Sequence, residues 1–276
     1  ASLPEDIIAI LSNIQNPSLN EMVLASTLTN NLFELLIIFG VVGALICTRS
    51  KCISVQQQER QIVLRNSVIM VIASLLGTIL AFSDGKLNWI DGLILLLFYS
   101  MFITIVYFTN KVGHDEINEE ELGDIEEINT LKQFGLMLFY LTLILLSSNA
   151  LVDNLVVINE NSAYFQEYGF LYLGIFIAMP DLIISVIGIL KEKESIVLGL
   201  IIGGVVWDLI VSIAIQSFIS PISIDSSMIG LFFISNVVST IVALIYIRTK
   251  WRLAKWETFT LIILFLIVFV LFFSFF

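Results

Sequence analysis

This sequence places four acidic residues in or beside apolar stretches, where carboxylates are unexpected: Glu5, Glu34, Asp181 and Asp208. A charge at the centre of a membrane helix costs about 2.5–3.5 kcal/mol on insertion scales. In GFLYLGIFIAMPDLIISVIGIL (169–190), Pro180 directly precedes Asp181, and a proline also removes a backbone hydrogen bond. Two unfavourable features at one place indicate a functional site, and carboxylate oxygens are the ligands that hard cations prefer.

Carboxylates gathered from several helices could bind a divalent cation. Calcium takes about 6–8 oxygen ligands at about 2.3–2.6 Å, so four carboxylates would supply most of its shell. Pro4 and Pro180 would break their helices and free backbone carbonyls as further ligands. Without a cation, carboxylates this close repel one another, so some should hold protons. A divalent cation would then displace protons or sodium ions, and this competition for one site is the physical basis of ion exchange.

The composition places these acids in a membrane. Hydrophobic residues make up 58% of the chain and charged residues 13%, against about 25% charged residues in soluble domains. The sequence therefore predicts an all-α integral membrane protein in contact with the lipid bilayer, and not a water-soluble enzyme. The net charge of −11 argues against nucleic acid as a partner, and the single histidine excludes metal clusters built from several histidines. We expect no cofactor.

Long apolar runs predict eight full membrane spans and one half-span. The half-span is 3–15, and the full spans are 21–47, 63–83, 88–109, 131–152, 166–190, 195–217, 226–247 and 256–276. If the spans alternate, twelve of the thirteen lysines and arginines fall on one side and only Lys86 on the other. By the positive-inside rule we expect the basic loops to be cytoplasmic. We expect a multi-pass protein, with the cell membrane as its location.

An acidic segment divides the chain. HDEINEEELGDIEE (114–127) lacks the alternating acids and central glycine of a calcium-binding EF-hand loop, and it is typical of a solvated linker. We expect an N-terminal half at 1–112, an acidic cytoplasmic linker at 113–128 and a C-terminal half at 129–276.

The two halves contain a repeated motif. ASLPEDIIAILSN in the first half is similar to IAMPDLIISVIGI in the second, and both place a proline before an acid. Each motif leads into another apolar helix with an acid of its own: Glu5 and Glu34 are 29 positions apart, and Asp181 and Asp208 are 27. The repeated regions are 1–40 and 177–214.

The loop charges give this repeat an orientation. The helix of Glu5 would run outward and the helix of Asp181 inward. The predicted fold is two inverted-topology repeats of about five transmembrane helices each, with the first helix and half of the second missing. Inverted repeats with discontinuous helices that meet at the membrane midplane are typical of secondary transporters. The four carboxylates would converge where the two copies meet.

These motifs resemble those of a known family. S-L-P-E before a helix, followed by LASTLTNNLFELLIIFG (24–40), resembles the first alpha repeat of the calcium/cation antiporter superfamily, which includes the sodium/calcium exchangers. The second repeat resembles its P-[ED]-L-x-x-S, followed by L-G-x-x-I-G-x-x-x-x-D. Weaker matches are NWIDGLILL (88–96) and ALVDNL (150–155).

The resemblance implies a function and a ligand set. It implies a secondary active transporter that exchanges Ca²⁺ or another divalent cation for Na⁺ or H⁺ by alternating access at a midplane carboxylate site. Glu5 and Asp181 match the central acidic ligands of the two repeats. Glu34 and Asp208 match the ligands from the second helices. The other candidates lie near positions where the family uses hydroxyl or carbonyl oxygens: Ser2, Asn30 and Ser185.

The sequence departs from the family pattern at several polar positions. The usual G-N-x-x-G-S-N reads ASTLTNN (25–31) in the first copy and GLIIGGV (199–205) in the second. The second copy has lost polar residues at Ile177, Ala178, Leu200 and Gly204, the last of which replaces a serine. Glu34 stands where many relatives have a neutral amide, so we expect more proton involvement than in a sodium-coupled exchanger.

Two other interpretations stay open. The lost polar ligands favour a non-transporting member of the family that acts as a membrane scaffold. Two intramembrane aspartates could form an aspartyl protease dyad, although the residues before Asp208 read VVW and not the usual G-x-G. Gly199 and Gly203 form a G-x-x-x-G motif, which predicts helix packing and not ligand binding.

Overall fold

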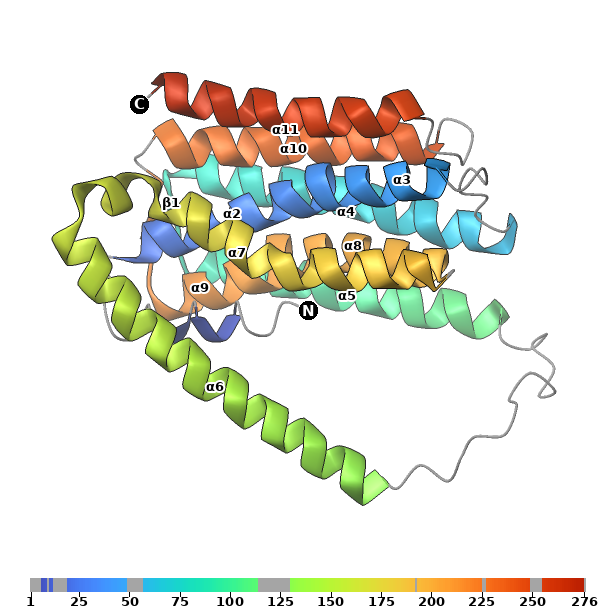
Figure 1. Cartoon of the computed structure of the whole chain (residues 1–276), viewed down its shortest axis with the longest axis horizontal. Helices are drawn as coiled ribbons and strands as arrows, with labels where there is room; N and C mark the ends of the chain where they lie inside the picture. Colours follow the sequence, from blue (N-terminus) through green and yellow to red (C-terminus); the bar gives the residue numbers. More distant parts are fainter. Residues whose placement is uncertain are drawn as a thin grey trace.

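The computed structural model describes residues 6–8, 10–11, 19–48, 57–113, 130–191, 193–224, 227–248 and 255–275. This part of the chain is almost entirely helical (Figure 1). In the first half lie α2 (Asn20–Phe33), η2 (Glu34–Ile38), α3 (Phe39–Thr48), α4 (Gln57–Ser83) and α5 (Trp89–Gly113). In the second half lie α6 (Thr130–Asn161), α7 (Ala163–Leu190), α8 (Glu194–Trp207), η5 (Asp208–Ser212), α9 (Ile213–Ile219), α10 (Ser227–Arg248) and α11 (Lys255–Phe275).

Eight helical segments of the described part are long and apolar enough to cross a membrane. They overlap the eight full spans that the sequence predicts, with the largest offset in the fourth, which is Leu138–Ile158 and not 131–152. The chain is a multi-pass integral membrane protein. Helices are the expected elements because each backbone N–H and C=O must find its partner within the segment when lipid surrounds it. Of the predicted half-span 3–15, only residues 6–8 and 10–11 are described, and all five are helical.

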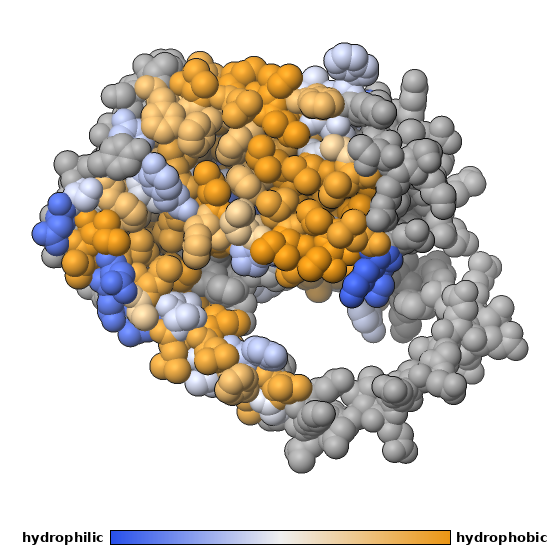
Figure 2. Space-filling view, viewed as in Figure 1, coloured by the Kyte–Doolittle hydropathy of each residue, from blue (hydrophilic) through white to orange (hydrophobic). Residues whose placement is uncertain are grey.

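Two segments form the centre of the bundle. In the apolar membrane-spanning part of α2–η2–α3, 78% of the residues are buried, and in that of α8–η5–α9, 67% are buried. In α6 and α11 the share is 17%. In Figure 1, α6 leans away from the other helices. Apolar residues cover most of the described face in Figure 2. The two central segments are the ones that carry Glu34 and Asp208, so these acids lie in the part of the fold most protected from lipid.

The helix contacts repeat between the two halves. α4 packs against α8 as α10 packs against α2, α5 packs against α9 as α11 packs against α3, and α4 packs against α10. In these contacts α2, α3, α4 and α5 correspond to α8, α9, α10 and α11. Exchanging each helix for its counterpart leaves this set of contacts unchanged. The same correspondence pairs α2–η2–α3 with α8–η5–α9, in agreement with the repeat that the sequence predicts.

The two central segments run in opposite directions. Asn30 of α2 contacts Asp208, and Thr27, earlier in α2, contacts Gln216, which lies later in α9. Residue numbers therefore rise along one segment as they fall along the other. An inverted-topology repeat requires this relation between corresponding helices.

Two short loops meet at one end of the bundle. β1 (Lys86–Leu87) and β2 (Ile222–Ser223) pair in antiparallel fashion, and Ser223 Oγ donates a hydrogen bond to Glu21 Oε1 at 2.5 Å. Alternating spans place the 84–88 loop, the 220–224 loop and the start of α2 on the same side of the membrane. The strand pairing agrees with that alternation.

Gly174 allows α7 to approach α2 closely. A β-carbon at this position would lie 2.6 Å from the Ser26 carbonyl oxygen and 2.7 Å from Thr29 Cβ. Small residues at such contacts let membrane helices pack backbone to backbone. Gly174→Ala should therefore lower the free energy of unfolding by about 1–3 kcal/mol, measured as a lower midpoint of thermal unfolding in detergent.

Gly203→Ala is the matched control, because nothing within 4 Å would meet its β-carbon. Equal unfolding midpoints for the two variants would contradict the close contact between α2 and α7.

The open space around Gly203 also corrects the predicted packing role of the G-x-x-x-G motif. Gly199 and Gly203 are both exposed on α8, and neither approaches another described helix. The small residues of α8 face outward here, so spacing alone misidentified the contact face.

Candidate cation site

Each of the two central segments contains five residues of π-helix, and each π segment begins at a predicted acid. η2 begins at Glu34, and the Phe39 N–H donates to the Glu34 carbonyl five residues earlier. η5 begins at Asp208 and ends at Ser212. Single-turn π segments inside α-helices occur frequently at functional sites. The acids that the sequence places at matching positions therefore share an uncommon local structure.

Asp208 joins the two halves. Its side chain is fully buried, and Asn30 Nδ2 donates a hydrogen bond to Asp208 Oδ2 at 2.9 Å. Two turns along the same contact, Gln216 Nε2 donates to Thr27 Oγ1 at 3.1 Å. Within the described part, the side-chain carbonyl oxygens of Asn30 and Gln216 have no hydrogen-bond partner. The Asn30 oxygen could therefore serve as a cation ligand beside Asp208.

Glu34 contacts acids of the other half. Its carboxyl group is hydrogen-bonded to Asp181 and lies close enough to Asp208 for direct repulsion. Its Oε2 atom is buried and has no hydrogen-bond partner among the described residues. Glu34 thus has two of the other predicted acids as neighbours, both from the second half of the chain.

The space beside Glu34 is set by Gly204. A β-carbon on Gly204 would lie 3.0 Å from Glu34 Oε2 and 3.5 Å from Oε1. The Glu34 carboxyl therefore occupies the room that a larger residue at 204 would need. The two departures from the family pattern, glutamate at 34 and glycine at 204, fit each other sterically.

Ser185 lies one turn after Asp181 and is fully buried, and its Oγ has no partner in the described part of the chain. The predicted helix break at Pro180 is wrong: α7 continues from Ala163 to Leu190 with Pro180 inside it. Proline still removes the N–H that would bond the Phe176 carbonyl. Packing of the flanking turns keeps proline-containing membrane helices continuous, and here α7 packs along α2.

The remaining predicted residues lie outside the described part: Ser2, Pro4 and Glu5. Among the residues that are described, no three histidine, cysteine or acidic side chains lie close enough together to hold a metal ion. A cation bound by Glu34, Asp181 and Asp208 together would therefore require their side chains to rotate. The predicted ligand roles, including that of Glu5, stay predictions.

Two buried polar residues near the predicted ligands escaped sequence reasoning. Asn31 is fully buried, and neither polar atom of its side chain has a partner within the described residues. Asp6 is buried and accepts hydrogen bonds from the second half of the chain. The available signal was spacing: Asn31 precedes Glu34 by one helical turn, and Asp6 directly follows Glu5.

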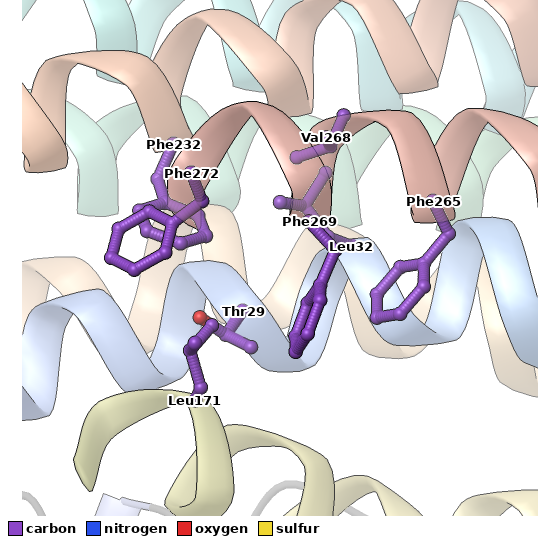
Figure 3. A pocket seen from close by; sticks show the side chains of 8 residues that line it. All are labelled: Thr29, Leu32, Leu171, Phe232, Phe265, Val268, Phe269 and Phe272. Carbon is purple, nitrogen blue, oxygen red and sulfur yellow. The ribbon is translucent and has the colours of Figure 1, made fainter. Parts of the chain in front are cut away.

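Aromatic side chains pack against α2 from α11. Figure 3 shows Phe265 and Phe269 beside Thr29 and Leu32, around a small apolar cavity of about 10 Å³. This volume is enough for about one water molecule. The cavity is lined by Thr29, Leu32, Leu171, Phe232, Phe265, Val268, Phe269 and Phe272. No acid lines it, so the candidate site is the packed polar contact between the halves and not this cavity.

Acids of both halves are neighbours inside a helical membrane bundle, an arrangement typical of membrane transporters. The chain belongs to the sodium/calcium exchanger protein family, which matches residues 1–108 and 132–275.

One curated relative is a bacterial membrane protein. Over 230 residues the chain is 24% identical to inner membrane protein YrbG of Escherichia coli (strain K12). This match covers 81% of this chain and 67% of that protein. The chain thus spans about two thirds of the length of this relative.

Two solved structures share the fold. One is the sodium-calcium exchanger NCX_Mj soaked with Na⁺ and Sr²⁺, with a TM-score of 0.66, 18% identity, and coverage of 98% of this chain and 82% of that one. The other is the H⁺/Ca²⁺ exchanger CAX, with a TM-score of 0.77, 16% identity, and coverage of 98% of this chain and 71% of that one. At these identities the likeness concerns the fold.

Proposed function

We propose that this chain is a secondary active transporter that exchanges Ca²⁺, or another divalent cation, for H⁺ or Na⁺. The observation that carries the proposal is the position of Glu34 next to Asp181 and Asp208 of the other half of the chain. The names of the two structural relatives, a sodium-calcium exchanger and an H⁺/Ca²⁺ exchanger, support the same class of substrate. Glu5 is proposed as the fourth carboxylate ligand.

The chemistry proposed for the site is competition between cations and protons. Glu34 has the acids Asp181 and Asp208 as neighbours, and neighbouring carboxylates repel one another, so these acids are proposed to share a proton when no cation is bound. A divalent cation would displace that proton to the solvent and offset two of the three carboxylate charges. Asn30 Oδ1 and Ser185 Oγ, both buried and without a partner in the described residues, are proposed as further ligands. Ser2 is proposed as a ligand from its place in the sequence alone.

Alternating access is proposed to occur where the two antiparallel segments meet. α2 and η5–α9 hold each other through side-chain hydrogen bonds, Asn30 to Asp208 and Gln216 to Thr27. Hydrogen bonds between membrane helices contribute about 0.6 kcal/mol on average, so a cation that draws Asp208 away can rearrange them. We further propose that the basic loops and the 113–128 linker face the cytoplasm of a cell membrane, as the positive-inside rule indicates.

Glu34 favours H⁺ over Na⁺ as the counter-ion. It adds a titratable carboxyl where a neutral amide would provide only oxygen for sodium. Calcium uptake into liposomes containing the purified chain should therefore be driven by a pH gradient with an acidic interior. A sodium gradient of equal size at fixed pH should drive less uptake. Radiolabelled calcium, with empty liposomes as the control, measures both.

The alternatives give different results in this assay. Uptake driven equally by sodium at fixed pH, and unaffected by a proton gradient, would refute the proton-coupled form of the proposal. Absence of calcium uptake under both gradients would favour a scaffold, as the apolar replacements Leu200 and Ala178 suggest. A protease would cleave a substrate without moving an ion.

A further inference from the structure

Asp6 connects the first helical residues of the chain to η5. Its Oδ2 accepts a hydrogen bond from Trp207 Nε1 at 2.9 Å, and its Oδ1 accepts one from Ser212 Oγ at 2.5 Å. Asp6 is 4% exposed. Trp207 is held in turn by Tyr99 of α5, whose ring meets the indole edge to face at 5.7 Å. One buried carboxylate therefore joins residues that are more than 200 positions apart.

The two donors flank the π segment that begins at Asp208. Trp207 is the residue before η5, and Ser212 is the last residue within it. In an α-helix, residues five positions apart point about 140° away from each other, because each residue turns by about 100°. A π turn, with its i→i+5 hydrogen bonds, brings such residues closer to one face. Asp6 therefore binds η5 in its π-helical form.

Asp6 lies next to one proposed ligand and holds the neighbour of another. Glu5 directly precedes Asp6 in the sequence, and Trp207 directly precedes Asp208. A shift of Trp207 would move the backbone of Asp208 with it. The hydrogen bonds of Asp6 to Trp207 and Ser212 thus restrain the position of Asp208.

The other copy of the repeat has apolar residues at all three matching positions. Aligning Glu5 with Asp181 places Leu182 opposite Asp6. Aligning Glu34 with Asp208 places Phe33 opposite Trp207 and Ile38 opposite Ser212. Phe33 and Ile38 are buried in the apolar core, and Leu182 packs against it. The acceptor and both donors are therefore present together in one copy and absent together from the other.

We propose that Asp6 is a positioning residue that, through Trp207 and Ser212, holds Asp208 in the geometry of the cation site. This inference rests on the proposed function. Both Asp6 oxygens already accept hydrogen bonds, one from Trp207 at the end of α8 and one from Ser212 at the end of η5, so its role is to hold the helix that carries Asp208. Residues that orient metal ligands from outside the coordination shell typically change affinity 10–100-fold when removed.

The test is calcium binding to the full-length chain in lipid nanodiscs, measured by calorimetry. Asp6→Ala and Ser212→Ala should each raise the Kd for Ca²⁺ about tenfold. The double variant should raise the Kd no further than Asp6→Ala does, because both changes break the same contact between Asp6 and Ser212. In uptake, KM for Ca²⁺ should rise while the maximal rate changes little. Ser217→Ala is the matched control. Ser217 is buried on α9, but its hydroxyl donates to the Ile213 carbonyl of its own helix.

A triple variant separates positioning from packing. This variant combines Asp6→Leu, Trp207→Phe and Ser212→Ile, the apolar residues found at the matching positions of the other copy. It should unfold at nearly the same temperature as the unmodified chain. It should still bind Ca²⁺ at least tenfold more weakly. Unchanged Kd in Asp6→Ala, Ser212→Ala and the triple variant, with lowered unfolding temperatures only, would overturn the proposal. If the unmodified chain binds no Ca²⁺, the proposed function itself fails, a result distinct from equal binding by all variants.

Discussion

Asp208→Asn should lower calcium uptake at subsaturating Ca²⁺ by at least about 100-fold, equivalent to about 2.7 kcal/mol. The amide keeps the size of the side chain and can still accept the hydrogen bond from Asn30 Nδ2. What the substitution removes is one negative charge in a fully buried position, where the bilayer and the protein screen charge poorly. Radiolabelled calcium flux into liposomes measures the effect.

The matched control for this substitution is Asp84→Asn. Asp84 lies in the exposed 84–88 loop, and its Oδ1 accepts a hydrogen bond from the Lys86 N–H at 3.1 Å, which an asparagine can also accept. Uptake by this variant should match that of the unmodified chain. Calcium uptake by Asp208→Asn within twofold of normal would show that Asp208 serves the contact between the halves and not the cation.

The sequence was sufficient to predict the number of spans and the pairing of the central acids. Apolar runs of about 20 residues have one stable structure in lipid, so their number survives in the fold. The spacing of Glu34 and Asp208 from their motifs identified two acids that the structure places in equivalent π segments. Their contact follows from the repeat, because corresponding helices of two inverted copies meet at the axis between them.

The π segments themselves left no signal in the sequence. ELLII and DLIVS contain no glycine or proline that would mark a widened turn. A π turn costs little where neighbouring helices bind the displaced groups, and those neighbours are distant in the chain. Asp6, more than 200 positions from Ser212, is one of them.

Local rules failed where tertiary packing decides the outcome. Pro180 meets the rule for a helix break, yet α7 continues through it because α2 packs along its length. Gly199 and Gly203 meet the rule for close helix packing, yet Gly174 makes the close approach instead. Spacing identifies a helix face, but it does not say which neighbour that face will meet.

Glu34 and Gly204 carry the prediction with the largest expected effect on coupling. Gly204→Ser restores the residue of the family pattern, but its β-carbon would lie 3.0 Å from Glu34 Oε2. The clash should displace the carboxyl and lower proton-driven calcium uptake at least about tenfold. Adding Glu34→Asn shortens the side chain, removes the clash and installs a neutral amide. The double variant should recover uptake, now driven by a sodium gradient in preference to a proton gradient.

This recovery would show that residues 34 and 204 determine the counter-ion as a pair. An amide and a hydroxyl offer oxygen ligands to sodium without a proton to exchange, whereas the carboxyl of Glu34 carries its own exchangeable proton. Gly203→Ser is the control, since a β-carbon there meets no atom within 4 Å. The ratio of proton-driven to sodium-driven uptake in liposomes decides the matter. A double variant that recovers uptake but keeps the normal ratio would place the choice of counter-ion elsewhere in the site.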